Sequence, residues 1–311
     1  MVTTYKTIEG SLKLSEVKES NNWINLVNPS KEELERIQED TGALMEYLEA
    51  PLDAEERPRI DLEDDQVMII INVPIEVEEG ESGILYDTIP LGIIIVNDHF
   101  ITVSLEEVNC LQDFITKGVK TMSTFKKTRL ALQIFYKTAT YYLKFLKHID
   151  RKTSELERSL HSSMQNEQLI KLLSLEKSLL YFTTSLKANE VVMKKIFRTN
   201  VVPMYEEDED LMEDALTETH QAIDMSEINS NILSGLMDAF ASIISNNLNQ
   251  VMKILTGLTI ILAIPTMIFS FFGMNLPMPG HESAWFTLVV LLLSIGIATS
   301  SWYILRKKNM L

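Results

Sequence analysis

Residues 234–275 read SGLMDAFASIISNNLNQVMKILTGLTIILAIPTMIFSFFGMN, a polar stripe that runs into a segment without charge. Within it, Ile254–Phe272 has 19 residues and no charged side chain, and Trp285–Leu305 has 21 residues and none. As helices, both are long enough to cross a hydrocarbon core of about 30 Å, because a helix rises about 1.5 Å per residue. Two such runs in succession favour membrane spans over the buried helices of a soluble core.

Basic residues flank the two spans on one side only. Lys253 precedes the first span, and Arg306, Lys307 and Lys308 follow the second. The positive-inside rule therefore places both termini in the cytosol of a multi-pass plasma-membrane protein. We expect a short outer loop at residues 273–284, a second span at 285–305 and a cytosolic basic tail at 306–311.

Charge is strongly segregated along the 311 residues, whose formal net charge is −16. Residues 1–116 carry a net −19, residues 117–198 a net +11 and residues 199–311 a net −8. This acidic balance argues against nucleic acid as a partner, since phosphate binding needs clustered Lys and Arg. No Lys or Arg lies between Arg198 and Lys253, which is a first indication of a path for cations.

The single cysteine, Cys110, excludes an internal disulfide and fits a reducing cytosolic setting. The N-terminal residues MVTTYKTIEG show no basic stretch followed by an apolar run, so we expect no cleaved signal peptide.

Residues 1–120 are predicted to form a cytosolic α/β domain. Four runs rich in Ile and Val have the character of strands: Trp23–Val27, Val67–Ile75, Leu91–Val96 and Phe100–Leu105. Ser30 followed by KEELERIQED predicts a capped helix.

An acidic cluster, Asp61, Glu63, Asp64 and Asp65, precedes the second of these runs. A solvated turn and a metal-binding function are equally compatible with this cluster.

Residues 121–203 are predicted to form an antiparallel pair of long helices. Apolar residues recur there at spacings of three and four, as at Leu130, Ile134, Tyr141 and Phe145. The polar patch Ser162–Gln168 indicates the turn between the two helices.

A heptad series ends at Gly273, and almost all its members are small, hydroxylic, amide or acidic. We call these positions the seam. Its members are Asp214, Thr217, Gln221, Asp224, Ile228, Asn231, Gly235, Asp238, Ser242, Ser245, Asn249, Met252, Thr256, Thr259, Ala263, Thr266 and Ser270.

In an ordinary coiled coil these positions are Leu or Ile, because they form the contact between helices. Small residues in the membrane part alone would favour simple helix packing. However, Asp214, Asp224 and Asp238 extend the seam far outside the membrane, and inward carboxylates are costly unless water or cations accompany them. The better interpretation is a stalk helix over residues 204–272 that continues into the first transmembrane helix and lines a water-filled pore.

Gly273-Met274-Asn275 at the outer end of the first span, after SGLMDAFASIISNNLNQVMKILT, resembles the CorA family of magnesium/cobalt transporters. WINLVNPSKEEL and EERPRIDLED are similar to N-terminal blocks of that family, so the resemblance covers nearly the whole chain. It implies a homopentameric funnel with a cytosolic α/β domain, long stalk helices and two transmembrane helices per subunit. The implied function is magnesium influx down the electrochemical gradient, gated by cytosolic magnesium, with cobalt and nickel as further ions.

The resemblance also implies roles for single residues. The selectivity filter falls on Gly273, Met274 and Asn275; pore-lining positions fall on Asn249 and Thr266, and gate positions on Met252 and Leu255. Thr256, Thr259, Ala263 and Ser270 join the pore because they lie on the seam. A regulatory Mg²⁺ site falls on Asp214 with Glu63, Asp64 or Asp65 of a neighbour, and a vestibule acid on Asp238; Asp224 is a further candidate ligand from the seam.

Two points stay open in this comparison. The family usually places a Glu in the outer loop after Met-Pro, whereas here Met278-Pro279 is followed by Gly280, with Glu282 two residues later. Leu255 is compatible with a gate and with helix or lipid packing alike.

Three other classes compete with this interpretation. A zinc transporter of the same fold commonly has Gly-Val-Asn in place of the tripeptide, so Met274 favours magnesium. A membrane-anchored coiled-coil sensor predicts an apolar seam and a sizeable outer domain, which the short outer loop does not allow. An enzyme is improbable, because the five histidines show no metal-ligand spacing and no nucleophile motif stands out.

Overall fold

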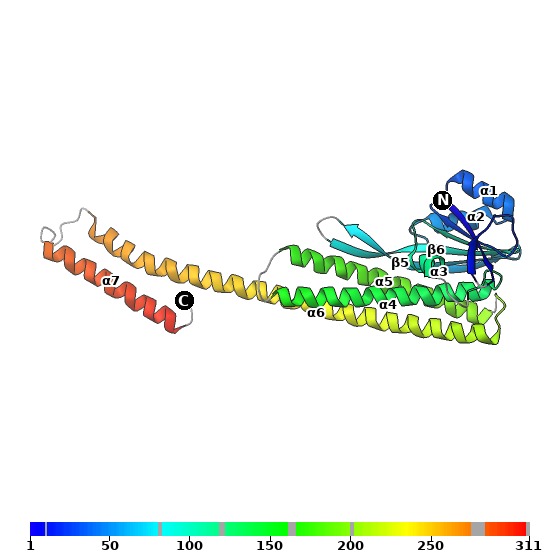
Figure 1. Cartoon of the computed structure of the whole chain (residues 1–311). Coiled ribbons are helices and arrows are strands. Elements are labelled where there is room, and N and C mark those ends of the chain that lie inside the picture. Colours follow the sequence, from blue (N-terminus) through cyan, green and yellow to red (C-terminus); the bar gives the residue numbers. More distant parts are fainter. Residues whose placement is uncertain are drawn as a thin grey trace. The chain divides into compact units, whose positions relative to one another are not determined.

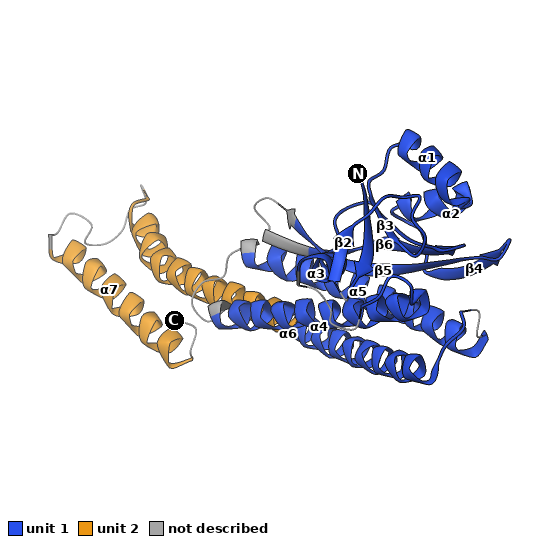
Figure 2. Cartoon of the chain, turned by 45° about the vertical axis from the view of Figure 1, so that its right-hand side comes forward, with its two compact units in different colours: residues 1–237 blue, residues 238–311 orange. Residues whose placement is uncertain are grey.

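The computed structural model describes residues 1–9, 11–79, 83–117, 122–160, 166–199, 202–274 and 284–308. The chain divides into two compact units, Met1–Met237 and Asp238–Leu311 (Figure 2). The long helix α6, Glu206–Phe272, contributes residues to both units.

A seven-stranded mixed sheet forms the centre of the first unit. Its order is β2-β1-β3-β7-β6-β5-β4, and among these neighbours only β3 and β7 pair in parallel. The strands are β1 (Val2–Ile8), β2 (Ser11–Leu14), β3 (Trp23–Val27), β4 (Arg59–Glu63), β5 (Gln66–Glu79), β6 (Gly83–Val96) and β7 (His99–Ser104).

Helices cover both faces of this sheet (Figure 1). One face packs against α1 (Lys31–Thr41), α2 (Met45–Glu49) and the short 3₁₀ helix η1 (Ala50–Leu52). The other packs against α3 (Asn109–Lys117), α4 (Lys127–Leu160), α5 (Asn166–Thr199) and the first part of α6.

The central strands are apolar on both sides because each side belongs to a different core. In β5, Ile69 and Ile71 join the core beneath α4 and α5, whereas Met68 and Ile70 join the core beneath α1 and α2. Two buried faces remove the usual alternation of polar and apolar residues. This explains why the run Val67–Ile75 is almost continuously hydrophobic.

The sequence-predicted strand Trp23–Val27 coincides with β3, and the other three runs fall within or overlap β5, β6 and β7. The cap predicted at Ser30 is confirmed: its hydroxyl accepts from the Glu33 amide at 3.2 Å, and the Glu33 carboxylate accepts from the Ser30 amide at 2.9 Å. The strands β1, β2 and β4 were not predicted from the sequence.

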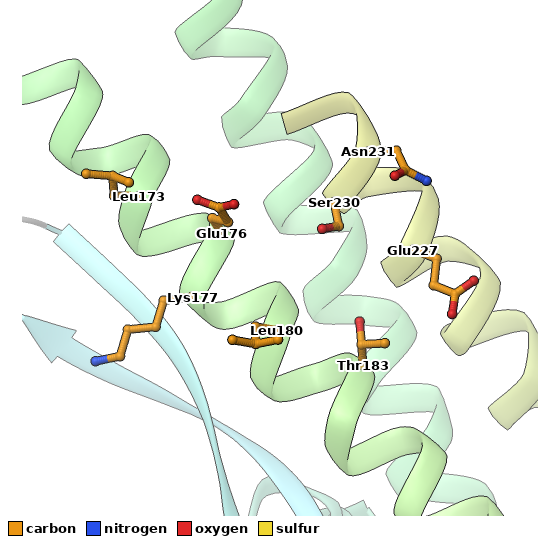
Figure 3. A pocket seen from close by; sticks show the side chains of 8 residues that line it. All are labelled: Leu173, Glu176, Lys177, Leu180, Thr183, Glu227, Ser230 and Asn231. Carbon is orange, nitrogen blue, oxygen red and sulfur yellow. The ribbon is translucent and has the colours of Figure 1, made fainter. Parts of the chain in front are cut away.

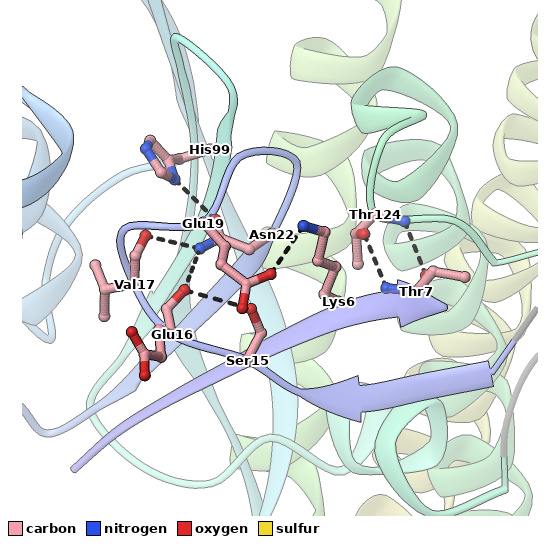
Figure 4. Close-up of polar contacts among 9 residues, drawn as sticks. All are labelled: Lys6, Thr7, Ser15, Glu16, Val17, Glu19, Asn22, His99 and Thr124. Carbon is pink, nitrogen blue, oxygen red and sulfur yellow. Dashed lines mark hydrogen bonds and ion pairs between the residues drawn. The ribbon is translucent and has the colours of Figure 1, made fainter. Parts of the chain in front are cut away.

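Hydrogen bonds from side chains join the loop before β3 to the rest of the first unit (Figure 4). The Asn22 amide donates to the carbonyls of Glu16 and Val17, and its oxygen lies 2.8 Å from His99 Nδ1. Burial lowers the pKa of His99, which keeps its ring neutral at physiological pH. Thr7 and Thr124 exchange two bonds at 3.1 Å, which tie β1 to the segment before α4.

Gly92 in β6 marks a close approach between the sheet and η1. A Cβ atom at this position would overlap the Pro51 ring, so only glycine fits without movement. We predict that Gly92→Ala lowers the midpoint of thermal unfolding, because overpacking a core costs about 1–3 kcal/mol. Circular dichroism of the purified full-length protein measures this change.

Gly235→Ala is the matched control, since a Cβ atom there meets nothing within 4 Å. Its unfolding midpoint should be unchanged or higher, because alanine is the better helix former. Equal midpoints for Gly92→Ala and the unmodified protein would contradict the packing described here.

Candidate functional site

The 67-residue helix α6 carries one heptad stripe that packs against its own chain. With heptad positions written a to g and the seam placed at a and d, this stripe occupies b and f. Its members from the first unit are buried: Asp208, Met212, Ala215, Thr219, Ala222, Ser226, Asn229 and Leu233. This second stripe is not evident from the sequence, because several of its members are small or polar.

Polar contacts fix α6 on α4 and α5. Ser226 Oγ lies 2.7 Å from Thr183 Oγ1 in α5, and Asn229 Nδ2 donates to the carbonyl of Leu146 in α4 at 3.4 Å. The orientation of α6 about its own axis is therefore set within the first unit.

Ion pairs fix the start of the same helix. Arg129 in α4 lies 3.2 Å from Asp208 and 3.3 Å from Glu207. Four acids stand in the first turn of α6, where the N-terminal end of the helix dipole favours negative charge. Asp208 is buried, so its pairing with Arg129 anchors this end of the helix.

The seam lies on the opposite side of α6 and is exposed throughout. In the first unit the members from Asp214 to Gly235 are exposed, and in the second unit so are those from Asp238 to Ser270. These side chains form a continuous stripe of carboxylate, amide, hydroxyl and small groups that the described part of the chain leaves uncovered. This stripe is the candidate functional site.

Large apolar side chains beside the seam are exposed as well. Ile232 is 48% exposed, Ile244 49% and Leu248 61%. Exposed large apolar side chains on a helix are suited to contact with lipid or with another protein surface. The helix is thus polar along one exposed stripe and apolar beside it.

Two seam threonines direct their protons into their own helix. Thr259 Oγ1 donates to the carbonyl of Leu255, and Thr266 Oγ1 donates to the carbonyl of Leu262, each at 2.8 Å. Because the single hydroxyl proton is engaged, each oxygen is left with only acceptor lone pairs for other partners. Such oxygens suit a cation or its hydration water.

The two apolar segments form helices of the expected length. The uncharged part of α6 and the helix α7, Ala284–Lys307, are long and apolar enough to cross a membrane. Few residues of either segment are buried within the structure, which separates them from the core helices of a soluble protein. Phe272 and Phe286 meet edge to face with ring centroids 5.6 Å apart.

The sequence-predicted filter lies only partly within the described residues. Gly273 donates to the carbonyl of Phe269 at 2.8 Å and Met274 to that of Phe271 at 3.4 Å, so the chain leaves α6 at this point. A Cβ atom on Gly273 would lie 3.0 Å from the Phe269 oxygen, which favours glycine. Asn275, Gly280 and Glu282 lie outside the described residues.

The predicted acidic ligands lie on two separate elements. Glu63 ends β4, and Asp64 and Asp65 form the two-residue turn to β5, with φ of 49° and 61°. Asp61, which the sequence places in the same cluster, pairs with Arg59 at 2.6 Å. Asp214, Asp224 and Asp238 are exposed seam members, and no three His, Cys, Asp or Glu side chains among the described residues of one chain gather as a metal site.

Together these features define a membrane protein with an α/β unit, a long helix bearing an exposed polar stripe, and two apolar helices. Residues 18–307 match the family described as CorA-like Mg²⁺ transporter protein, and the chain belongs to that family. The family resemblance inferred from the sequence is therefore confirmed, as is the expectation that the chain is not an enzyme.

Individual relatives agree with this assignment. The chain is 30% identical over 300 residues to the cobalt/magnesium transport protein CorA of Methanocaldococcus jannaschii, covering 92% of this chain and 90% of the relative. It is 23% identical over 296 residues to the CorA protein of Thermotoga maritima, covering 93% and 83%.

Solved structures confirm the predicted fold class. The complete structure of the CorA magnesium transporter from M. jannaschii superposes with a TM-score of 0.83 at 26% identity, covering 100% of this chain and 99% of that chain. The cytoplasmic domain of ZntB from Vibrio parahaemolyticus superposes with a TM-score of 0.62 at 11% identity, covering 78% and 98%. The second likeness shows the shared fold alone.

The seam of α6 is exposed and its b and f stripe is buried, so a cysteine placed on the seam should react with a thiol reagent and one placed on the buried stripe should not. Thr217→Cys on the seam should react with a small, charged methanethiosulfonate reagent, whereas Ser226→Cys in the buried stripe should not. The native Cys110 is an internal control, because burial raises its pKa to about 12 and only the thiolate reacts. Mass spectrometry of the intact labelled protein at pH 8 counts the modified thiols.

A reactive Ser226→Cys together with an unreactive Thr217→Cys would reverse the orientation of α6 and contradict the site described here.

Proposed function

We propose that this chain is one subunit of a homopentameric channel that carries Mg²⁺ into the cytosol, with Co²⁺ and Ni²⁺ as further ions. Membership of the CorA-like Mg²⁺ transporter family supports the class of cargo. The observation that carries the proposal is the continuous exposure of the seam from Asp214 to Ser270. Five copies is the number implied by the family resemblance.

A single copy has two unfavourable features, inward-facing carboxylates and exposed apolar side chains, and assembly around the seam removes both. Seam carboxylates such as Asp224 need water or cations around them, and a central wet axis supplies both. Apolar residues beside the seam, such as Ile232 and Leu248, need cover, and neighbouring copies or lipid supply it. A ring of parallel α6 helices with the seam inward satisfies both requirements.

The seam offers acceptor oxygens along the proposed pore. Thr259 and Thr266 present lone pairs because their protons are engaged with the helix backbone. Asn249 adds an amide oxygen, and Thr256, Ala263 and Ser270 are small enough to leave room for water. Magnesium loses its hydration water reluctantly, so a lining that accepts hydrogen bonds from that water suits its passage.

Selection of the ion is assigned to Asn275 at the outer end of the first span. Five amide oxygens arranged in a ring would hold a hydrated Mg²⁺ by its water shell, without stripping it. Gly273 and Met274 shape the turn that carries this ring. The membrane potential supplies the driving force, since a divalent ion gains about 4.6 kcal/mol per 100 mV.

Closure of the pore is assigned to Met252 and Leu255. Both side chains are large, apolar and exposed, at 53% and 55%. A ring of such residues empties a narrow pore of water and blocks ions without any charge. Both lie close to Lys253, which the positive-inside rule places at the cytosolic face.

Regulation is assigned to Mg²⁺ bound between neighbouring subunits. Asp214 on α6 of one subunit and Glu63, Asp64 or Asp65 of the next would supply the carboxylate oxygens that this ion prefers. Their exposure fits such a site, because each side chain is free to meet a neighbour. Bound Mg²⁺ would favour the closed ring, whereas unneutralised carboxylates would repel one another and loosen it.

The remaining seam acids are assigned to the inner pore. Asp238 would act as the acid of the cytosolic vestibule, and Asp224 would be a further site for a passing or bound cation. The basic last turn of α7, with Arg306 and Lys307, supports placing the C-terminus in the cytosol of a plasma-membrane protein.

Replacement of the filter residue tests the ion path. We predict that Asn275→Ala abolishes magnesium-dependent growth of a cell that lacks its own magnesium uptake, because the ring loses its amide oxygens. Asn109→Ala, a matched change at an exposed position of α3, should support normal growth. Growth of the Asn275→Ala cells at the unmodified rate would exclude the assigned filter.

Purified protein in liposomes then separates this function from a zinc transporter of the same fold. Flux of Mg²⁺ at rates well above that of Zn²⁺ is the expected outcome, as Met274 favours the magnesium branch. A zinc-selective flux would overturn the proposed cargo.

Neutralising Asp214 tests the regulatory site. We predict that Asp214→Asn raises the cytosolic Mg²⁺ concentration that halves the current by about tenfold or more, because a lost carboxylate contact of about 1.4 kcal/mol has this effect. Patch-clamp recording from excised membrane measures the shift. Asp150→Asn, at an exposed position of α4, should leave the dependence unchanged. An unshifted dependence in Asp214→Asn would remove this residue from the regulatory site.

A further inference from the structure

An open groove of about 600 Å³ lies between α5 and α6 in the first unit (Figure 3). On the α5 side it is lined by Leu173, Glu176, Lys177, Leu180 and Thr183, and on the α6 side by Glu227, Ser230 and Asn231.

The α5 side of the groove carries two apolar side chains that nothing in the described part of the chain covers. Leu180 is 64% exposed and Leu173 46% exposed, although both are large hydrophobic side chains. They belong to an exposed stripe of α5 that also carries Lys177 and Lys187. A stripe that mixes leucine with lysine fits a surface that is both apolar and acidic.

The groove occupies one particular edge of α6. Contacts between α5 and α6 fall at heptad positions f and g: Thr183 meets Ser226 at 2.7 Å, and Lys187 meets Glu227 at 2.6 Å. The helix α5 therefore lies beside the g edge. Because α5 and α6 run in opposite directions, the Thr183–Ser226 contact places Leu180 about one turn further on, near residue 230 of α6.

The opposite edge of α6 carries exposed apolar side chains of its own. Ile232 at position e is 48% exposed and Ile228 at position a is 57% exposed. This face of α6 contains acids such as Asp224, and no Lys or Arg occurs between Arg198 and Lys253. It is the apolar and acidic surface that the α5 stripe would fit.

In a ring of parallel helices with a and d inward, the g edge of each helix faces the e edge of its neighbour. The g residue of one heptad then meets the e residue of the next heptad of the other chain. Glu227 lines the groove at position g, and the e residue that follows it is Ile232. The heptad register therefore indicates Ile232 of the neighbouring chain. The position of Leu180 beside residue 230 of α6 indicates the same residue.

We infer that Ile232 of a second copy of this chain inserts into the groove between Leu180 and Glu227, making the groove a socket of the subunit interface. This inference rests on the proposed ring of α6 helices and specifies its lateral contact. The partner is the adjacent copy, whose Ile232 would cover the exposed Leu180.

Cysteine cross-linking tests this contact in the full-length protein in membranes. Oxidation of the double variant Leu180→Cys/Ile232→Cys should produce ladders of cross-linked subunits on a non-reducing gel. A second pair, Thr183→Cys/Ile228→Cys, joins positions at the same level and serves if the first variant fails to fold. The native Cys110 is buried and does not interfere.

Val191→Cys/Ile232→Cys is the matched control. Val191 lies on the same exposed stripe of α5 and is 65% exposed, but about 16 Å further along the helix, at about 1.5 Å per residue. It should give no ladder. The single seam variant Gln221→Cys tests the ring of α6 helices without the socket, because the introduced thiols of different subunits would face one another across the axis.

The outcomes are distinct. Ladders from the socket pairs without ladders from the Val191 control support the socket. Seam ladders without socket ladders overturn the inference and leave the ring intact, and equal ladders from the Val191 control overturn it as well. If neither the seam variant nor the socket pairs give ladders, the proposed ring of α6 helices is contradicted. The socket, which depends on that ring, is then contradicted as well.

Discussion

The packing of α6 against the α4–α5 hairpin determines what every other surface of this helix can do. Buried contacts at Thr219, Ser226 and Asn229 fix its rotation, and the pairing of Asp208 with Arg129 fixes its start. Once these positions are buried, the heptad positions on the opposite side stay outside the subunit. Those positions carry carboxylate, amide and hydroxyl groups rather than leucine.

This arrangement accounts for the otherwise unusual composition of α6. A helix that packs on one side only would normally carry charged residues on its exposed face, yet α6 carries isoleucine and leucine beside a stripe of small polar groups. Two exposed surfaces of different polarity imply two different environments. Water along the seam and protein or lipid beside it satisfy both, and the family of the chain is one of transporters.

Much of this arrangement could be predicted from the sequence, because long helices and long apolar runs give strong periodic signals. The seam could be recognised since the same spacing continues from Asp214 through the membrane segment. The buried stripe could not be predicted, because Ala215, Thr219 and Ser226 are no more hydrophobic than surface residues. Edge strands such as β2, with four residues, are too short to show a pattern. Asn275, the residue proposed as the filter, follows from its sequence motif alone, because it lies outside the described residues.

The central claim is that the seam of several copies faces one common, water-filled axis. Electron cryo-microscopy of the purified assembly tests this claim most directly, because it shows both the symmetry and the direction of each side chain. We expect a fivefold axis lined by Asp238, Asn249 and Thr266. A structure in which these three side chains face lipid, or a dry contact between helices, would contradict it.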